Sequence, residues 1–363
     1  MRGGTGAATL VLANARLVPP LTDRGPFHRS AGVFDRTGAF CDLANIRRGD
    51  ALELQPKQLD AVPPVKLAGR HLYGGQLNNH FGHFLCETLS RLWALEGAQG
   101  VDSILLLPRR NAAETVFQPY HTEFFALLNL PVPVKIVTEP LEVDELIIPE
   151  QGFGIGDLST GIPAFRDWIA RNLAPDIAAE GPENIYLSRE GLGIRTGAAL
   201  NETALAENLL INGYELFLPE QHSLPVQIAR YRAAKKIVGV EGSALHLYGL
   251  VGHQNQQVGI IARRADLDAS ETIRRQIRAF CGAEAHVFSA ILREWDLHDD
   301  PVRSSKSLAE LDLPALGRAM AAAGLISSDP WPDSAADPSE LLARIQRRTG
   351  RVFQEIARNG VRD

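Results

Sequence analysis

The second half of the chain alternates between short apolar runs and longer amphipathic runs at a nearly constant spacing. Runs rich in β-branched and aromatic residues, which predict strands, begin at residues 185, 214, 236, 258 and 285. These starts lie 22 to 29 residues apart, which is the repeat of a strand followed by a crossover helix in a parallel sheet. Amphipathic segments fill three of the intervals, at 202–211, 227–234 and 271–280. The sequence therefore predicts a Rossmann-like domain over residues 181–295.

The rest of the chain predicts a second α/β domain and a helical C-terminal extension. A chain of 363 residues has room for two domains, and the polar, turn-rich segment 174–184 is the best linker between them. Before the linker, the predicted strands are 103–107, 134–137 and 145–148, and the predicted helices are 79–95 and 113–128. After residue 295, helices are predicted over 308–323 and 339–357. The expected domains are thus 1–180, 181–295 and 296–363.

Composition and charge exclude several classes of protein. The chain has 37 basic and 43 acidic residues and a formal charge of −6, so no nucleic-acid partner and at most peripheral contact with a membrane are expected. Its three cysteines, Cys41, Cys86 and Cys281, include no CxxC pair, which argues against a zinc knuckle or a disulfide framework. No apolar run approaches the roughly 20 residues of a membrane span, and no convincing signal peptide is found. These features favour a cytoplasmic protein.

Polar segments leave two strands of the predicted Rossmann-like domain at their carboxyl ends, where sheets of this kind bind ligands. One segment follows the strand that begins at 185, and the other follows the strand that begins at 236 and opens a helix. Arginines can neutralise a diphosphate, backbone N–H groups at a glycine-serine helix start can approach it, and a glutamate can accept from a ribose hydroxyl. The alternative is a set of solvated arginines beside an ordinary helix start. The candidates are Ser188, Arg189, Arg195, Glu241, Gly242, Ser243 and His246.

A second polar pattern lies in the predicted helix 79–95. His80, His83, Glu87 and Arg91 recur at i, i+3, i+7 and i+11, which places them on one face of a regular helix. His83 and Glu87, four residues apart, are within reach of each other, and a carboxylate beside an imidazole is a general-base arrangement. The alternative is the solvated face of an amphipathic helix.

The order of these motifs along the chain resembles glycosyltransferase family 61. The resemblance covers roughly residues 74–289 and rests on the segments 81–87, 91–93, 186–189, 201–202, 213–215 and 239–245, together with Arg195 and Gln227. It implies a GT-B architecture, in which two Rossmann-like domains face each other across a cleft. It also implies inverting transfer from a nucleotide sugar, usually a UDP-sugar, without an obligatory divalent metal. The residues that it places around the donor nucleotide are Ser188, Arg189, Arg195, Asn201 and Glu202.

One position departs from the family pattern, and one motif needs a separate interpretation. Many members carry His-Gly-Ala where this chain has Glu241-Gly242-Ser243. Asp266-Leu267-Asp268 spells Asp-x-Asp, which other glycosyltransferases use for a metal-bound nucleotide, but a helix cap at Asp268 is the more economical interpretation. The pattern His-x-x-His-x-x-x-Glu matches no common set of metal ligands. We therefore expect no metal and no cofactor besides the nucleotide-sugar substrate.

The expected function is an inverting glycosyltransferase that moves a sugar from a UDP-sugar to a saccharide or glycolipid acceptor in bacterial polysaccharide or glycolipid synthesis. Inversion requires a base that removes the proton of the acceptor hydroxyl, and His83 and Glu87 are the candidates. Either Glu87 removes the proton itself, or it orients His83 while the imidazole removes it. Two other classes stay open: a non-catalytic carbohydrate- or nucleotide-binding protein of the same fold, and a nucleotide-dependent transferase of a non-sugar group.

Overall fold

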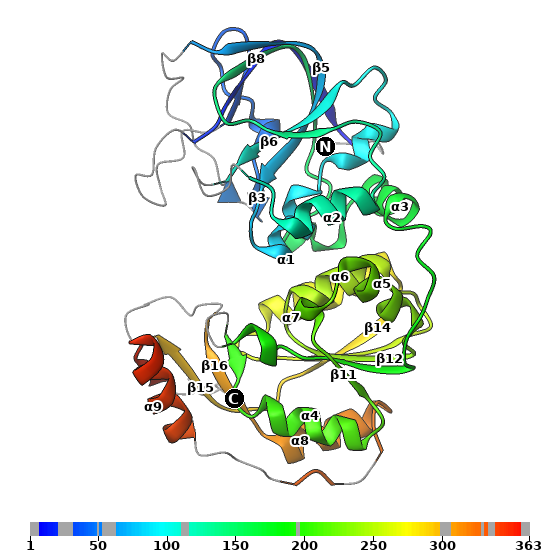
Figure 1. Ribbon diagram of the computed structural model, residues 1–363, viewed down its shortest axis with the longest axis vertical. Coiled ribbons are helices and arrows are strands. Elements are labelled where there is room, and N and C mark those ends of the chain that lie inside the picture. Colours follow the sequence, from blue (N-terminus) through cyan, green and yellow to red (C-terminus); the bar gives the residue numbers. More distant parts are fainter. Residues whose placement is uncertain are drawn as a thin grey trace, which may run out of the picture. The chain divides into compact units, whose positions relative to one another are not determined.

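The structure, a computed structural model, divides into two compact units. The described residues are 7–20, 32–48, 51–52, 63–109, 116–193, 197–297, 306–327, 330–332 and 338–356, with backbone only at 51–52. The N-terminal unit comprises residues 1–176 and the C-terminal unit residues 177–363, and both mix helices with strands (Figure 1). The α/β class predicted from the sequence is therefore confirmed.

The C-terminal unit is built on a five-stranded parallel sheet, in the order β11-β9-β12-β13-β14. Its strands are β9 (Asn184–Leu187), β11 (Glu215–Phe217), β12 (Lys236–Val240), β13 (Gln257–Ile261) and β14 (Glu284–Phe288). The joining helices are α4 (Glu202–Ile211), α5 (Leu224–Ala233), α6 (Ser243–Val251) and α7 (Asp268–Phe280). Figure 1 shows α5, α6 and α7 over one face of the sheet and α4 over the other. The five predicted strands and three predicted helices of this unit are confirmed.

The end of the chain contributes strands as well as helices, so the prediction of a helical extension was wrong in part. The elements are β15 (Ile291–Leu297), β16 (Leu308–Leu311), α8 (Leu313–Ala322), α9 (Pro338–Thr349) and β17 (Phe353–Glu355). Together with β10 (Ala198–Ala199), the three strands form a second sheet in the order β10-β16-β15-β17.

Two local features explain why the helix predicted over 308–323 begins only after a strand. All four residues of β16 are buried, as in a strand covered on both faces. Asp312 then caps α8, because its side chain accepts a hydrogen bond from the backbone N–H of Ala315. Leu316 and Met320 of α8 are fully buried in one core with Leu205 of α4. This segment is therefore part of the C-terminal unit rather than an extension of it.

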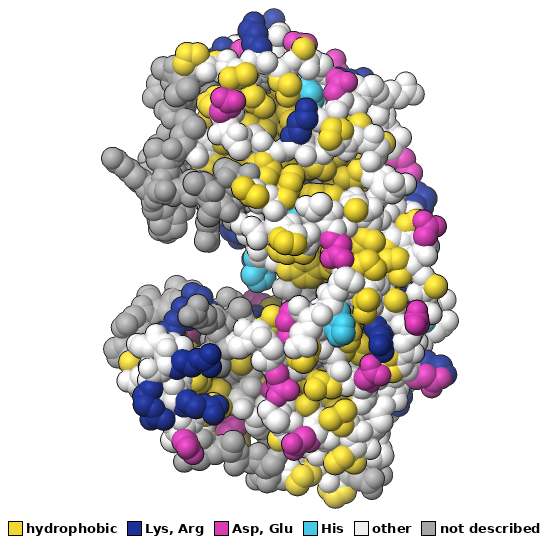
Figure 2. Space-filling model, viewed as in Figure 1, with side chains coloured by type: hydrophobic (Ala, Val, Ile, Leu, Met, Phe, Trp, Pro, Cys, Tyr) yellow, Lys and Arg dark blue, Asp and Glu magenta, His cyan; other side chains and the backbone are white. Residues whose placement is uncertain are grey.

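Charged side chains of both signs are interspersed over most of the face shown in Figure 2. A group of Lys and Arg side chains gathers at the position of α9, whose exposed arginines are Arg344, Arg347 and Arg348. The apolar side of this helix faces inward, since Leu341, Leu342 and Ile345 pack in a small core with Trp295 of β15. The basic character of the surface is thus local, as the net charge of −6 requires.

The N-terminal unit contains a six-stranded mixed sheet, in the order β2-β1-β8-β5-β6-β7. Its strands are β1 (Thr9–Val18), β2 (Gly32–Phe34), β5 (Val65–Leu77), β6 (Ser103–Pro108), β7 (Val134–Ile136) and β8 (Leu141–Pro149). Strands β8, β5, β6 and β7 run parallel, whereas β1 is antiparallel to both of its neighbours. The interpretation as a second Rossmann-like domain therefore holds only for the parallel part, because β1 and β2 add an antiparallel edge.

The long helix predicted over 79–95 is broken into three short pieces. These are α1 (Phe81–His83), a π-helical turn η2 (Phe84–Thr88) and a 3₁₀ turn η3 (Leu92–Glu96). A π turn holds an extra residue, so the side chains beyond it leave the face that an α-helix would give them. Regular helices of this unit are α2 (Pro119–Leu127) and α3 (Pro163–Asn172).

The break moves Arg91 away from the helix face predicted for it. Arg91 is buried in the core, donates from Nη2 to the carbonyl of Asn45 (2.6 Å) and from Nη1 to that of Pro149, and lies 5.4 Å from the ring centre of Tyr73. Burial lowers its pKa. The single polar stripe that would carry Arg91 alongside His83 and Glu87 was therefore a wrong prediction.

His121 of α2 is a buried histidine held in its neutral form. Its Nδ1 accepts from the backbone N–H of Gln118 (3.1 Å), and its Nε2 donates to the carbonyl of Asn78 (3.0 Å). A second ring proton would have no acceptor at Nδ1. Burial lowers the pKa of His121 from 6.5 to about 4, and the hydrogen bond to Asn78 opposes this only in part.

This histidine predicts a loss of stability at mildly acidic pH. The unfolded chain takes up the proton near pH 6.5 and the folded chain only near pH 4, so the contribution is complete above pH 6.5 and falls as the pH drops toward 4. Between pH 7 and 4.5 the free energy of unfolding should fall by about 2 kcal/mol from this group alone. Urea unfolding at both pH values measures it, and His121→Gln should lose clearly less. An equal loss in both proteins would contradict the assignment.

Candidate functional site

The carboxyl ends of β9, β12 and β13 meet at one edge of the parallel sheet. From β9 the chain moves to β11 on one side, and from β12 it moves to β13 on the other side. Such a reversal of strand order leaves a crevice in which doubly wound sheets bind ligands. The segments that leave the three strands here are Ser188–Arg189, Glu241–Ser243 and Arg263–Arg264.

Glu202 holds the turn after β9 in place. Its Oε1 accepts from the hydroxyls of Tyr186 (3.0 Å) and Ser188 (2.8 Å) and from the backbone N–H of Arg189 (2.6 Å). Burial raises the pKa of Glu202, and these hydrogen bonds oppose that rise. Ser188 and Glu202, both predicted to border a nucleotide, thus make their hydrogen bonds to each other and to the turn. They position Arg189.

Arg189 lies across the glycine at the start of α6. A Cβ atom on Gly242 would overlap its guanidinium group, so only glycine leaves room for the arginine at this point. The guanidinium also donates from Nη2 to the carbonyl of Gly197 (3.4 Å). Burial lowers the pKa of Arg189, while the charges of Glu202 and Glu241 raise it. A cation therefore lies directly beside the N-terminus of α6.

Glu241 is bonded within the protein through both carboxylate oxygens. Its Oε1 accepts from Nε (3.1 Å) and Nη2 of Arg264, and its Oε2 accepts from the hydroxyl of Ser270 (2.8 Å). Arg263 donates from Nε to the backbone carbonyl of Glu241 (3.2 Å). The expected hydrogen bond from a ribose to Glu241 would have to compete with these partners.

Arg263 and Arg264 are site residues that the sequence reasoning missed. Burial lowers the pKa of Arg263 to about 10, and the nearby charges of Arg189 and Arg264 act in the same direction. The three arginines are thus close enough to influence one another. The sequence pattern could have indicated these two arginines. They follow the strand predicted to begin at residue 258, and they leave it at the same sheet edge as the other candidates.

The remaining predicted residues of this unit lie in different surroundings. Asn201 is buried and bonds to the backbone of Leu311 in β16, with Nδ2 donating to the carbonyl (2.8 Å) and Oδ1 accepting from the N–H (3.0 Å). Nδ1 of His246 lies 2.6 Å from Oε1 of Gln276 on α7. Ser243 is the first residue of α6 and is partly exposed. Arg195 lies outside the described residues.

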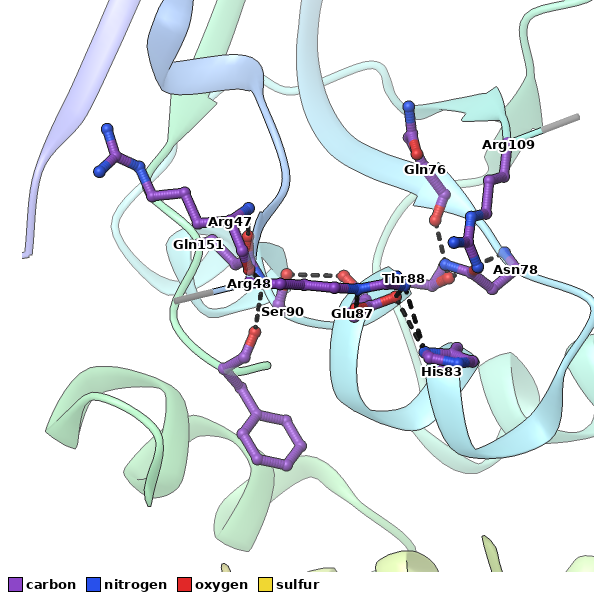
Figure 3. Close-up of polar contacts among 11 residues, drawn as sticks. Arg47, Arg48, Gln76, Asn78, His83, Glu87, Thr88, Ser90, Arg109 and Gln151 are labelled. Carbon is purple, nitrogen blue, oxygen red and sulfur yellow. Dashed lines mark hydrogen bonds and ion pairs between the residues drawn. The ribbon is translucent and has the colours of Figure 1, made fainter. Parts of the chain in front are cut away.

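In the N-terminal unit, the expected contact between His83 and Glu87 is present and has a third member. His83 Nδ1 lies 3.2 Å from Glu87 Oε2. Arg48, from the two-residue strand β3 (Arg47–Arg48), donates from Nε to Glu87 Oε1 (2.5 Å) and from Nη2 to Glu87 Oε2 (2.8 Å), as Figure 3 shows. The carboxylate is therefore held by a two-pronged arginine contact on one side and an imidazole on the other.

The environment of Glu87 makes it a weak base. Burial raises the pKa of Glu87, but the hydrogen bonds from His83 and Arg48 outweigh burial and lower the pKa to about 2. The Glu87 side chain has no exposed surface, whereas that of His83 is 28% exposed. A substrate can thus reach the imidazole but not the carboxylate.

Backbone contacts of β3 position Arg48 beside Glu87. The N–H of Arg47 donates to Gln151 Oε1 (2.8 Å), and Gln151 Nε2 donates to the carbonyls of Arg47 (3.3 Å) and Phe153 (3.0 Å). The loop after Gln151 is tied in turn to the segment just after η2, since the N–H of Gly152 donates to the carbonyl of Ser90 (2.8 Å). No motif marks Arg48 in the sequence, and it lies 39 residues before Glu87.

The other side of η2 is anchored to the carboxyl ends of β5 and β6. The Thr88 hydroxyl donates to the carbonyl of Gln76 (2.7 Å) and accepts from the N–H of Asn78 (3.1 Å). Arg109, which follows β6, donates from Nη1 to Asn78 Oδ1 (2.8 Å). Figure 3 shows this second group of contacts on the far side of η2 from Arg48. The segment with His83 and Glu87 is thus fixed from two directions.

The described residues hold neither a cluster of metal ligands nor a helix suited to cross a membrane. They contain no cluster of three or more His, Cys, Asp or Glu side chains with the geometry of a metal site. Asp266 instead accepts through Oδ1 from the backbone N–H of Asp268 (2.9 Å), at the start of α7. Among the same residues, no helix combines the length and apolar character needed to cross a membrane.

A family model described as Glycosyltransferase 61 matches residues 81–250. The matched segment begins at α1 and ends within α6, so it contains His83, Glu87, Glu202 and Gly242. Arg48 and the pair Arg263–Arg264 lie outside it. A search of curated proteins finds no match.

Proposed function

Because residues 81–250 of this chain belong to glycosyltransferase family 61, we propose that the protein is an inverting glycosyltransferase. Its donor is a UDP-sugar, and its acceptor is a hydroxyl group of a saccharide or glycolipid in the synthesis of a bacterial polysaccharide or glycolipid. The nucleotide binds at the sheet edge of the C-terminal unit. The base that activates the acceptor is His83 of the N-terminal unit, oriented by Glu87.

The observation that carries this proposal is the group formed by Arg189, Arg263 and Arg264 beside the first turn of α6. Four carboxylates act on Arg189 or Arg263, namely Glu202, Glu220, Glu241 and Glu294. Glu202 and Glu241 already accept hydrogen bonds from several protein groups. The first backbone N–H groups of a helix have no partner within the helix, and the helix dipole favours an anion at this end. A diphosphate bound here would receive hydrogen bonds from cations and from backbone N–H groups together. It is the leaving group of sugar transfer from a nucleotide sugar.

The exposure and charge of the His83 environment support its role as the base. As the acceptor oxygen attacks the anomeric carbon, its proton passes to Nε2 of His83, and the bond between that carbon and the diphosphate breaks. The ionised Glu87 stabilises the imidazolium that results. Glu87 itself is buried and has a pKa of about 2, which favours orientation over direct proton removal.

The proposal predicts nucleotide binding and turnover that survive chelation of divalent metal. Arginines and helix N–H groups supply the positive charge that a cation would otherwise provide at the leaving diphosphate. UDP should therefore raise the melting temperature equally with and without EDTA, and transfer should continue in EDTA. A loss that Mn²⁺ or Mg²⁺ restores would instead assign a metal role to an acidic pair such as Asp266 and Asp268.

A panel of nucleotides tests the proposed donor. UDP should raise the melting temperature more than UMP or uridine, because only UDP presents the diphosphate to the arginines. Transfer is then measured as UDP release from UDP-sugars in the presence of saccharide acceptors. Absence of any nucleotide shift would refute the donor site, and UDP binding without turnover on any sugar would identify a non-catalytic binding protein.

A further inference from the structure

We propose that Arg48 is a positioning residue for the reaction: through its two bonds to Glu87 it keeps the hydrogen of the neutral His83 ring on Nδ1 and leaves Nε2 free to accept a proton. The catalytic meaning of this inference rests on the proposed function. The arrangement of protons that it describes does not, because that arrangement belongs to the protein without substrate.

Nδ1 of His83 has two neighbours, one that accepts a hydrogen bond and one that donates a hydrogen bond. Glu87 Oε2, at 3.2 Å, can only accept while the carboxylate is ionised, and Arg48 Nη2, at 3.4 Å, can only donate. A hydrogen on Nδ1 satisfies Glu87 and leaves the lone pair on Nε2. A lone pair on Nδ1 would satisfy Arg48, but the hydrogen would then occupy Nε2 and the ring could not act as a base there.

The distances favour the hydrogen on Nδ1. Arg48 Nη2 already donates to Glu87 Oε2 at 2.8 Å, and its contact with the imidazole is the longer of the two. Arg48 also helps to keep Glu87 ionised, because its hydrogen bonds and charge lower the pKa of that carboxyl. An ionised carboxylate is the partner that best retains a hydrogen on Nδ1.

Charge gives Arg48 a second effect on the same ring. A lone carboxylate beside an imidazole favours the doubly protonated form, which cannot accept another proton. The Arg48 guanidinium, which is bound to the carboxylate of Glu87, opposes double protonation of the ring. Among the described residues, the titratable or charged groups in contact with the ring are Glu87 on η2, Arg48 on β3 and the His80 ring, whose centre lies 5.0 Å away. Removal of Arg48 therefore leaves Glu87 as the dominant charge beside His83.

The neighbouring arginine of β3 provides a matched control. Arg47 is exposed, and its hydrogen bonds to Gln151 use its backbone N–H and carbonyl groups. Arg47→Gln thus removes one arginine from the same strand and leaves the contact between Arg48 and Glu87 in place. Arg48→Lys keeps the positive charge but cannot reproduce the two-pronged contact.

The test is nitrogen-15 NMR of the histidine side chains in the full-length chain, with the His83 signal assigned by its loss in His83→Gln. In the native protein the neutral ring should show the hydrogen on Nδ1. In Arg48→Gln the ring should stay doubly protonated to a pH higher by about one unit or more, and the acid limb of the pH profile of kcat should move by the same amount. Arg47→Gln should match the native protein, and Arg48→Lys should return part of the shift.

Two results would overturn the inference: a native ring with its hydrogen on Nε2, or an Arg48→Gln ring that titrates as in the native protein. If Arg48→Gln does not fold, as judged by circular dichroism, the comparison of Arg48→Lys with the native protein decides the same question, since the loss of the two-pronged contact should itself shift the titration. If the NMR result holds but no nucleotide sugar is turned over, the proposed function fails and the role of Arg48 stands.

Discussion

Glu87→Gln is expected to lower kcat by a factor of about 10²–10⁴ while the affinity for UDP stays nearly unchanged. The amide keeps the shape of the side chain but loses the charge that orients His83 and stabilises its imidazolium. The effect belongs to the chemical step, because Glu87 lies in the N-terminal unit and the proposed nucleotide site in the other. Steady-state kinetics with saturating donor and acceptor measures it.

Two further variants separate catalysis from folding at this position. His83→Asn should lower kcat to a similar extent while the pair of Arg48 and Glu87 stays intact. Glu96→Gln, on η3, removes only an exposed ion pair with Arg171 and should be active, since such pairs contribute little to stability. If Glu87→Gln and His83→Asn melt at lower temperature but turn over normally when folded, both residues are structural and the base lies elsewhere.

Arg189→Ala and Arg264→Gln are each expected to weaken UDP binding by roughly ten- to a hundredfold, the loss of about 1.5–3 kcal/mol that a charge-assisted hydrogen bond provides. Arg264→Gln still leaves Glu241 with Ser270 and Arg263 as partners, so the sheet edge should keep its structure. Isothermal titration of UDP gives the dissociation constants directly.

Uridine and a surface arginine provide the controls for this experiment. Uridine lacks the diphosphate, so its weaker binding should be the same in native protein, Arg189→Ala and Arg264→Gln. Arg274→Gln, on α7, removes an arginine that pairs with Glu271 on the surface and should bind UDP as the native protein does. Unchanged UDP affinity in both site variants would show that the diphosphate lies elsewhere.

The fold of the C-terminal unit could be predicted because its signal is local and repeated. Strands and helices alternate there at a nearly constant spacing, and β9, β12 and β13 are short runs of mostly buried residues. In the N-terminal unit, β1 and the beginning of β5 carry exposed residues, which weakens the apolar pattern. The break at η2 was missed because a π turn depends on what packs around it. Here those surroundings include buried Arg91 and the contacts of Thr88.

The candidate site was predictable where neighbours in sequence are neighbours in space. His83 and Glu87 lie one turn apart, and Ser188–Arg189 leave the end of a strand. Arg48 reaches Glu87 through a long-range contact that no local pattern marks. The resemblance predicted that Asn201 and Glu202 lie beside the nucleotide. In the structure, Asn201 bonds to β16 and Glu202 bonds to the turn that carries Arg189. The influence of Glu202 on a ligand would pass through Arg189.

The contact between Arg48 and Glu87 also has a consequence for the evolution of the chain. The Glu87 side chain has no exposed surface, so a relative that lost only the arginine would keep a buried carboxylate without its two-pronged partner. Breaking a buried ion pair in this way costs about 3–5 kcal/mol, a large part of the stability of most proteins. Selection should therefore act on the two positions jointly. Homologous chains should retain both residues or replace both, and position 48 should covary with position 87 although it lies outside the segment that the family model matches.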